Sequence, residues 1–198
     1  MTINLKKGQK IDLTKGAAGI SELTVGLGWD PIKKAGGGFL SGLFGGGGQD
    51  IDCDASVLML REGDRLQEVV YFGQLKSKCN SIVHSGDNLT GDGDGDDEQI
   101  FVSLNKVPSS IHKLVFVVNI YQAVQRKQDF GMIQNAYIRI VNKNTNEELC
   151  RYSLTDNYGG QTALIAGEVY RHQGEWKFAA IGQGTTDPSL KELASRYA

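Results

Sequence analysis

Short runs of β-type residues recur along the chain, and turn residues separate them. The runs are rich in Val, Ile, Tyr and Phe, and they are bounded by Gly, Asn, Asp and Pro, which is typical of strands. Nine runs are predicted as strands, at residues 23–29, 55–60, 69–72, 99–104, 113–121, 136–141, 147–154, 163–171 and 176–181. The run 113–121 is apolar on both faces, which predicts a central strand.

The segments between these runs predict hairpins and little helix. Residues 142–146 and 172–175 are rich in turn formers and link consecutive runs. We expect a short helix within 122–128 and a C-terminal helix over 188–197, with Asp187 as its N-cap. Many strands without long intervening helices favour an all-β fold, a two-sheet β-sandwich with a few short helices, in one domain over 1–198.

Composition predicts an ordinary globular protein of the cytoplasm. The 198 residues are enough to bury a sizeable core. Three cysteines, Cys53, Cys79 and Cys150, form no CxxC pair, which argues against a disulfide framework and fits a reducing compartment. The N-terminus lacks the apolar run of a signal peptide, and no segment approaches the ~20 apolar residues of a membrane span.

Acidic residues are concentrated in one short segment. Six of them, and no Lys or Arg, lie between Asp87 and Glu98. The other 17 acidic residues of the chain face 21 basic ones, so the net charge of −2 hides a mildly basic remainder. No basic stripe with interleaved aromatic residues is present, and we therefore expect no nucleic-acid partner.

The acidic segment has the chemistry of a calcium site. Like charges repel by roughly 1 kcal/mol per pair at ~4 Å even in water, and a hard dication relieves that repulsion. Calcium takes ~6–8 oxygen ligands in adaptable geometry, whereas magnesium usually keeps waters and a phosphate partner. The glycines between the aspartates allow the chain to curl. The spacing is not that of an EF-hand, and a solvated acidic loop without metal is the alternative.

A second acidic group, Asp50, Asp52 and Asp54, precedes the run 55–60. If a strand begins here, the two-residue period places these carboxylates on one face, at the rim of a sheet. Together, the two groups would form one cluster with room for more than one ion.

The glycine-rich stretch 36–48 carries Phe39, Leu40, Leu43 and Phe44. One interpretation is a flexible surface loop whose apolar residues fold back on the sandwich. The other is an exposed apolar finger for a partner chain or a membrane surface. A phosphate-binding loop is excluded, because no Lys-Ser/Thr follows the glycines.

Residues with catalytic potential are few. His84 lies just before the acidic segment, and a structural histidine at a strand end is favoured over acid–base work. Cys53 stands between two aspartates, which oppose a reactive thiolate and favour a core cysteine. The alternative to a binding protein is a metal-dependent hydrolase that acts on a phosphate ester or nucleotide at the acidic cluster.

Several blocks of the sequence resemble the signature of the TerD family of tellurium-resistance proteins. They follow the order found in the family and span nearly the whole chain: residues 25–30 (VGLGWD), 52–56 (DCDAS), 86–100 (GDNLTGDGDGDDEQI), 130–139 (FGMIQNAYIR) and 167–178 (GEVYRHQGEWKF). The stretch 36–48 departs from the shorter connection common in the family.

The resemblance implies a β-sandwich that binds two calcium ions and serves in resistance to tellurite, phage or colicins. It implies a sensor or scaffold rather than an enzyme, acting beside other stress-resistance proteins, some of them associated with membranes. Carried over by position, the metal-site residues are Asp52, Asp54, Asp87, Asp92, Asp94, Asp96, Asp97 and Glu98. No oligomeric state follows from the sequence.

Overall fold

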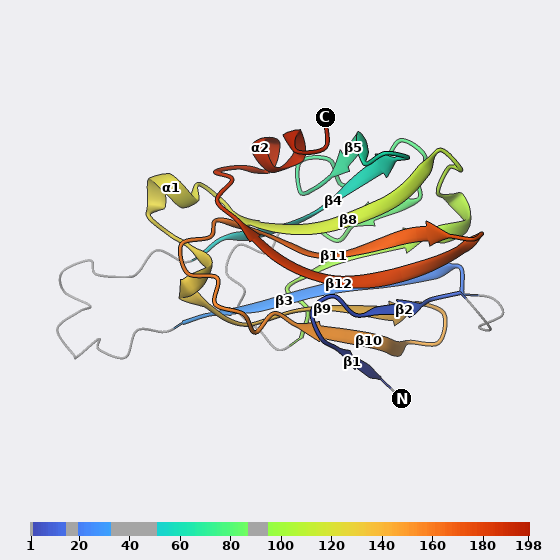
Figure 1. The fold of residues 1–198 in the computed structure, drawn as a ribbon, viewed down its shortest axis with the longest axis horizontal. Helices are drawn as coiled ribbons and strands as arrows, with labels where there is room; N and C mark the ends of the chain where they lie inside the picture. Colours follow the sequence, from blue (N-terminus) through green and yellow to red (C-terminus); the bar gives the residue numbers. More distant parts are fainter. Residues whose placement is uncertain (1, 15–19, 33–50, 87–94) are drawn as a thin grey trace.

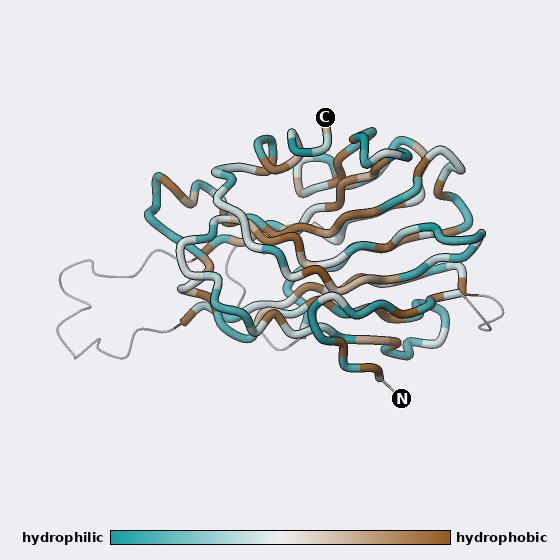
Figure 2. Tube along the Cα trace, viewed as in Figure 1, coloured by the Kyte–Doolittle hydropathy of each residue, from teal (hydrophilic) through white to brown (hydrophobic). Residues whose placement is uncertain are grey.

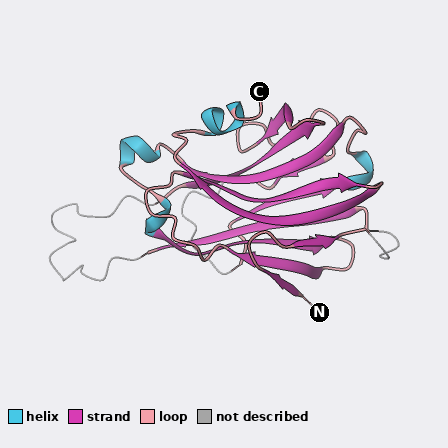
Figure 3. Ribbon diagram, viewed as in Figure 1, coloured by secondary structure: helices cyan, strands magenta, loops and turns pink. Residues whose placement is uncertain are grey.

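The computed structural model describes residues 2–14, 20–32, 51–86 and 95–198, which form two facing β-sheets (Figures 1 and 3). In spatial order, sheet A contains β1 (Ile3–Leu5), β10 (Glu147–Ser153), β9 (Ile133–Asn142), β3 (Glu22–Pro31), β7 (Glu98–Ser103) and β6 (Ile82–His84). Sheet B contains β2 (Lys10–Asp12), β12 (Glu175–Thr185), β11 (Ala163–His172), β8 (Ile111–Ile120), β4 (Cys53–Arg61) and β5 (Arg65–Val70). The all-β, two-sheet architecture predicted from the sequence is confirmed.

Each of the nine predicted runs corresponds to a strand. Both predicted hairpins are present, because β9 pairs antiparallel with β10 and β11 with β12. The prediction that 113–121 is central is confirmed, since β8 lies between β4 and β11. Three strands were not predicted. β1, β2 and β6 have three residues each, too few for a period of two to be visible.

Helices are short, as expected, and lie outside the sheets (Figure 3). They are α1 (Ala123–Arg126), α2 (Leu190–Ser195) and two 3-10 turns, η2 (Leu104–Lys106) and η3 (Phe130–Met132). The predicted N-cap at Asp187 is wrong. Ser189 precedes the first turn of α2, and the Asp187 carboxylate instead accepts a hydrogen bond from Nε of Arg196 at 2.7 Å.

The main core fills the space between the sheets, and a second core covers the outer face of sheet B. Leu27, Val57, Phe116 and Ile138 belong to the first, alternating along their strands with outward-facing residues. The second core packs Leu193 of α2 onto residues of β4, β8 and β11. β8 is apolar on both faces for this reason, and hydrophobic residues run along it in Figure 2.

The described residues leave some sequence predictions untested. The stretch 36–48 and the aspartates 87, 92 and 94 lie outside them. Within the part of the chain that the structure describes, no helix is both long enough and apolar enough to cross a membrane.

Candidate metal centre

The starts of β4 and β7, the strands that follow the two acidic groups of the sequence, meet at one end of the sandwich. β4 of sheet B begins at Cys53, and β7 of sheet A begins at Glu98. The side chain of Glu98 is fully buried, and its Oε2 accepts a hydrogen bond from the backbone N–H of Ala55 at 2.7 Å. The starts of two strands that are distant in sequence are therefore joined directly, one from each sheet.

This contact replaces a missing strand neighbour. β5 pairs with β4 only from Val57 to Arg61, so Ala55 lies beyond the paired stretch. Unpaired backbone groups at a buried sheet edge are costly. Glu98 accepts the Ala55 N–H, and Nε2 of His84 lies 3.0 Å from the Ala55 carbonyl oxygen. Two side chains of sheet A thus satisfy the open edge of β4.

His84 has a structural role, as the sequence predicted. Its Nδ1 accepts a hydrogen bond from the N–H of Gly86 at 3.1 Å, which leaves Nε2–H to donate toward the Ala55 carbonyl. Burial lowers the pKa of His84, but the hydrogen bond and negative charge of Glu98 outweigh it, so the pKa lies above its ordinary value. Since both ring nitrogens are engaged, His84 is not a free metal ligand.

The buried thiol of Cys53 lies at the start of β4, between Asp52 and Asp54 in sequence. Burial raises the pKa of this thiol well above its ordinary value, and the charges of Asp54, Asp52, Glu98 and Asp97 raise it further, in that order. Cys53 itself is fully buried in the main core. The predicted core cysteine is confirmed.

Asp97 is anchored to β3 at this end of the sandwich. Its Oδ2 accepts the backbone N–H of Trp29 at 2.7 Å, and its own N–H donates to the Leu27 carbonyl at 2.9 Å. Burial raises the pKa of Asp97, the Trp29 hydrogen bond lowers it, and the charges of nearby carboxylates raise it, with a net increase. A cation close to Asp97 would oppose this increase in pKa.

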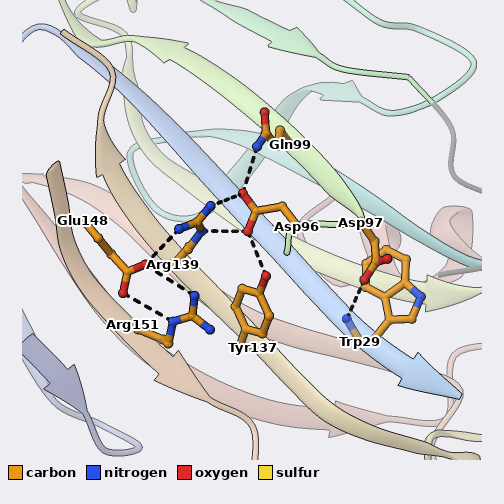
Figure 4. A network of polar contacts seen from close by, with 8 residues as sticks. All are labelled: Trp29, Asp96, Asp97, Gln99, Tyr137, Arg139, Glu148 and Arg151. Atoms are coloured by element: carbon orange, nitrogen blue, oxygen red, sulfur yellow. Dashed lines mark hydrogen bonds and ion pairs between the residues drawn. The ribbon is translucent and has the colours of Figure 1, made fainter. Parts of the chain in front are cut away.

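Asp96 points away from this cluster, onto the outer face of sheet A (Figure 4). Its Oδ1 and Oδ2 accept Nε and Nη2 of Arg139 at 2.7 and 2.9 Å. Tyr137 and Gln99 donate to the same carboxylate, each at 2.9 Å. The Asp96 side chain is fully buried beneath these donors. Asp96, which the resemblance grouped with the metal-site residues, is thus enclosed by donors from the protein itself.

Gly26 makes room for this arrangement. A Cβ on Gly26 would overlap the Asp96 carboxylate. Gly26 pairs with Arg139 on one side and Gln99 on the other, so three strands of sheet A converge on Asp96. A glycine inside a strand often marks such a close approach. That glycine is the one sequence signal that could have revealed the contact.

The network continues beyond Asp96 (Figure 4). Nη1 of Arg139 donates to Glu148 at 2.9 Å, and Arg151 bonds Glu148 while its guanidinium lies 4.0 Å from the ring of Tyr137. Burial raises the pKa values of Asp96 and Glu148, but the hydrogen bonds from the arginines and other donors lower both below their ordinary values. These two carboxylates are ionised and already neutralised by protein cations.

The structure thus separates the predicted ligands. It fixes Asp97 and Glu98 by hydrogen bonds at the start of β7, whereas the Asp54 carboxylate accepts from Asn119 of β8. It places Asp96 against Arg139 of β9, and it does not describe Asp87, Asp92 and Asp94. Arg126 of α1, which the sequence did not single out, lies with its Nη1 3.6 Å from Oδ2 of Asp52. Among the described residues alone, no three His, Cys, Asp or Glu side chains converge closely enough to hold a metal ion.

Comparison with known proteins places the chain in a family. It is 62% identical, over the whole of both chains, to stress response protein SCP2 of Bacillus subtilis (strain 168). It is 41% identical to tellurium resistance protein TerD of Serratia marcescens, covering all of this chain and 97% of that protein.

A solved structure agrees with the fold. The crystal structure of SAV2460, a protein of unknown function, superposes with a TM-score of 0.65 at 25% identity, covering 89% of this chain and 95% of that one. The model of the TerD domain matches residues 1–197. The chain therefore belongs to the TerD family of stress-response and tellurium-resistance proteins.

Proposed function

We propose that this protein is a calcium-binding stress-response protein of the cytoplasm whose acidic rim, once ordered by the ion, serves as an interaction surface. The observation that carries the proposal is the contact between the starts of β4 and β7, the strands that follow the two acidic groups of the sequence: the buried Glu98 side chain accepts the backbone N–H of Ala55 at 2.7 Å. Residues 87–94, with three further aspartates, lead directly into this point. Such an accumulation of carboxylates needs a countercharge.

The donor chemistry fits calcium. The clustered side chains offer carboxylate oxygens, which hard cations prefer, and the one nearby imidazole is engaged through both nitrogens. We assign the binding of two ions to Asp52, Asp54, Asp97 and Glu98 together with Asp87, Asp92 and Asp94. Asp96 is left out of this set, because Arg139 already neutralises it. The ions would supply positive charge that relieves the mutual repulsion of these groups.

The residues around the cluster give the rim a rigid base. Glu98 and His84 tie sheet A to the edge of β4, and Asp97 is tied to β3. The segment that enters β7 is therefore fixed at its end by the fold itself. Ion binding at this end of the sandwich would present a surface to a partner protein.

Partners are inferred from the relatives. Proteins similar to this chain are named for resistance to tellurium and, in Clostridium acetobutylicum, to chemical-damaging agents. We propose that the calcium-ordered rim contacts other stress-resistance proteins, including some at the membrane. The proposal contains no catalytic step.

Thermal unfolding with calcium or with a chelator tests this function. A ligand that binds only the folded state adds about 2.7 kcal/mol of stability at 100 times its Kd, so calcium should raise Tm clearly. Asp54→Asn should diminish the rise. Asp64→Asn, in the turn at the other end of β4, should leave it unchanged.

Equal Tm values in calcium and in chelator would overturn the proposal. If the metal-loaded protein hydrolyses a model phosphodiester and Glu98→Gln abolishes that activity, the protein is instead the metal-dependent hydrolase that the sequence left as the alternative.

A further inference from the structure

A cavity of about 620 Å³ lies on the outer face of sheet B, between α2 and β5. These two elements lie close together at one edge of the molecule (Figure 1). The backbone N–H of Leu66 in β5 donates to the carbonyl of Tyr197, just after α2, at 2.6 Å, so the two walls are tied to each other. Cavities that hold small organic ligands typically measure ~300–1,000 Å³, and this one falls in that class.

The second core is only partly covered at this cavity. Leu66, Val69 and Leu190 pack against that core and also line the cavity, and each keeps part of its surface exposed. α2 has six residues, and these three side chains remain partly uncovered beside it. Contiguous apolar surface that stays exposed often marks a site for a ligand or a partner. The apolar body of a ligand would supply the contact that α2 leaves out.

Two aromatic side chains extend this apolar surface. Phe72 and Tyr121 line the cavity, and each is 38% exposed. The ring of Tyr71 meets Phe72 edge to face, with the ring centroids 5.4 Å apart. The guanidinium of Arg126 lies over the ring of Tyr121 at 5.1 Å. Each ring is thus contacted by a neighbour and still has accessible surface for a ligand.

The accessible charge at this cavity is positive. Lys191 and Ser195 are one helical turn apart on the flank of α2 that lines the cavity, and both are exposed. Lys191 forms no ion pair with a carboxylate of the described residues, and its neighbour Glu192 is not part of the lining. Asp54, the acid among the described lining residues, is 4% exposed and already accepts a hydrogen bond. The group that remains for a charged ligand is therefore the ammonium of Lys191.

We propose that this cavity binds a single-chain fatty-acid anion. Its alkyl chain packs on Val69, Phe72 and Leu190, and its carboxylate lies at the exposed rim beside Lys191. The head group stays partly in water, so the ligand needs no buried polar partner. An alkylamine of the same length meets Lys191 with like charge, and a fatty alcohol carries no charge. This site is separate from the proposed calcium centre, and the proposal does not rest on that function.

The alkyl chain and the head group contribute differently to binding. Each methylene that is fully buried raises affinity by roughly fourfold, so decanoate should bind about tenfold more tightly than octanoate. An exposed ion pair changes affinity by up to about fivefold, so decanoate should bind at least about threefold more tightly than decylamine. The chain therefore supplies most of the affinity, and Lys191 supplies the preference for an anion.

The experiment titrates octanoate, decanoate, decanol and decylamine, below their micelle concentrations, into the nitrogen-15-labelled full chain. Chelator is present because calcium precipitates fatty acids, and backbone amide shifts report both the affinity and the place. Decanoate should give saturable shifts at Val69 and Leu190, with decanol intermediate in affinity between decanoate and decylamine. No saturable shift at these residues, equal affinities of decanoate and octanoate, or equal affinities of decanoate and decylamine would overturn the proposal.

A charge reversal tests the head-group contact. Lys191→Glu should make decylamine the tighter ligand and leave decanol unchanged, because only the sign of the charge at the rim differs. Lys106→Glu changes the net charge equally, at an exposed lysine of η2 outside the cavity lining, and should keep the preference for decanoate. The same shift in preference in both variants would show a general effect of net charge and would overturn the assignment to Lys191.

A truncation tests the apolar wall. Phe72→Ala should weaken octanoate, decanoate, decanol and decylamine alike, whereas Leu75→Ala, 46% exposed and outside the lining, is its matched control and should weaken none. Equal effects of the two changes would contradict the location. Vesicles of phosphatidylglycerol separate a free fatty acid from a membrane surface. If the protein sediments with these vesicles through Phe72 and does not bind decanoate, the surface binds membranes and the proposal is wrong.

Discussion

Asp96 and Asp97 are adjacent in sequence, yet they have opposite surroundings. Asp96 lies on the outer face of sheet A, where Arg139, Tyr137 and Gln99 donate to it and its pKa is lowered. Asp97 lies at the acidic rim, where burial and neighbouring carboxylates raise its pKa. Arg139 of the protein neutralises Asp96. In our proposal, a bound dication neutralises the carboxylates at the rim.

The comparison shows that a run of acidic residues is not one functional unit. Neighbouring positions at the start of a strand point to different faces, so alternate acids can serve different purposes. In this chain, one acid fastens three strands of sheet A together, and the acids beside it join the rim cluster. The predictions below separate these two roles.

The largest effect is expected from Arg139→Met. This change leaves the buried Asp96 carboxylate without its cation, and breaking a buried ion pair costs ~3–5 kcal/mol. Because 27% of the Arg139 side chain is exposed, we expect the lower end, about 3 kcal/mol, in the free energy of unfolding measured by denaturant. Arg61→Met, an exposed arginine in β4, should change it by less than about 0.5 kcal/mol. Equal losses for both variants would contradict the role of Asp96.

A second effect concerns Gly26. The Cβ of Gly26→Ala would overlap the Asp96 carboxylate, and overpacking typically costs ~1–3 kcal/mol, so we expect about 2 kcal/mol. In an Asp96→Ala background the obstacle is gone, and the same change should cost less than about 0.5 kcal/mol. A double-mutant cycle by denaturant unfolding measures this coupling. Additive costs would show that Gly26 does not serve Asp96.

A smaller effect of opposite sign is expected at the rim. Asp97→Asn keeps an acceptor for the Trp29 N–H but removes one charge from the carboxylate cluster. In chelator, this variant should be more stable than the wild type by up to about 1 kcal/mol, the repulsion of one close pair in water. In calcium the order should reverse. Loss of stability in both conditions would contradict the account of the rim.

The smallest effect is a difference in pH dependence. Asp96 and Glu148 have lowered pKa values in the folded state, so the stability they contribute is present above their ordinary pKa values of ~3.9 and ~4.3. It is lost as the pH falls below that range, because the unfolded chain takes up protons first. Arg139→Met removes a cause of both shifts. Its stability should fall less between about pH 5 and pH 3 than that of the wild type, in urea melts across that range.

Much of the sandwich could be predicted from the sequence, because the longer strands carry local patterns. The apolar residues on both faces of β8 indicate that this strand is central. The turn-forming residues between β9 and β10 and between β11 and β12 indicate that these pairs form hairpins. The three-residue strands β1, β2 and β6 have no such pattern, and the order of strands in the two sheets depends on long-range contacts.

The sequence predicted which acidic residues are candidates for the site, but it did not predict where each of their side chains lies. That the two acidic groups precede strands whose starts lie close together was an expectation, and the contact of Glu98 with Ala55 joins those two strand starts. The fate of Asp96 depends on Arg139, 43 residues away, and on the space above Gly26. No local pattern reveals such a contact, and this is why Asp96 was grouped with the ligands.

Calcium titration calorimetry on metal-stripped protein tests the central claim most directly. The wild type and Asp96→Asn should take up the same number of ions with Kd values within about threefold, while Glu98→Gln should bind at least about tenfold more weakly, ~1.4 kcal/mol. No uptake of calcium by the wild type would contradict the account. So would a loss of uptake in Asp96→Asn as complete as the loss in Glu98→Gln.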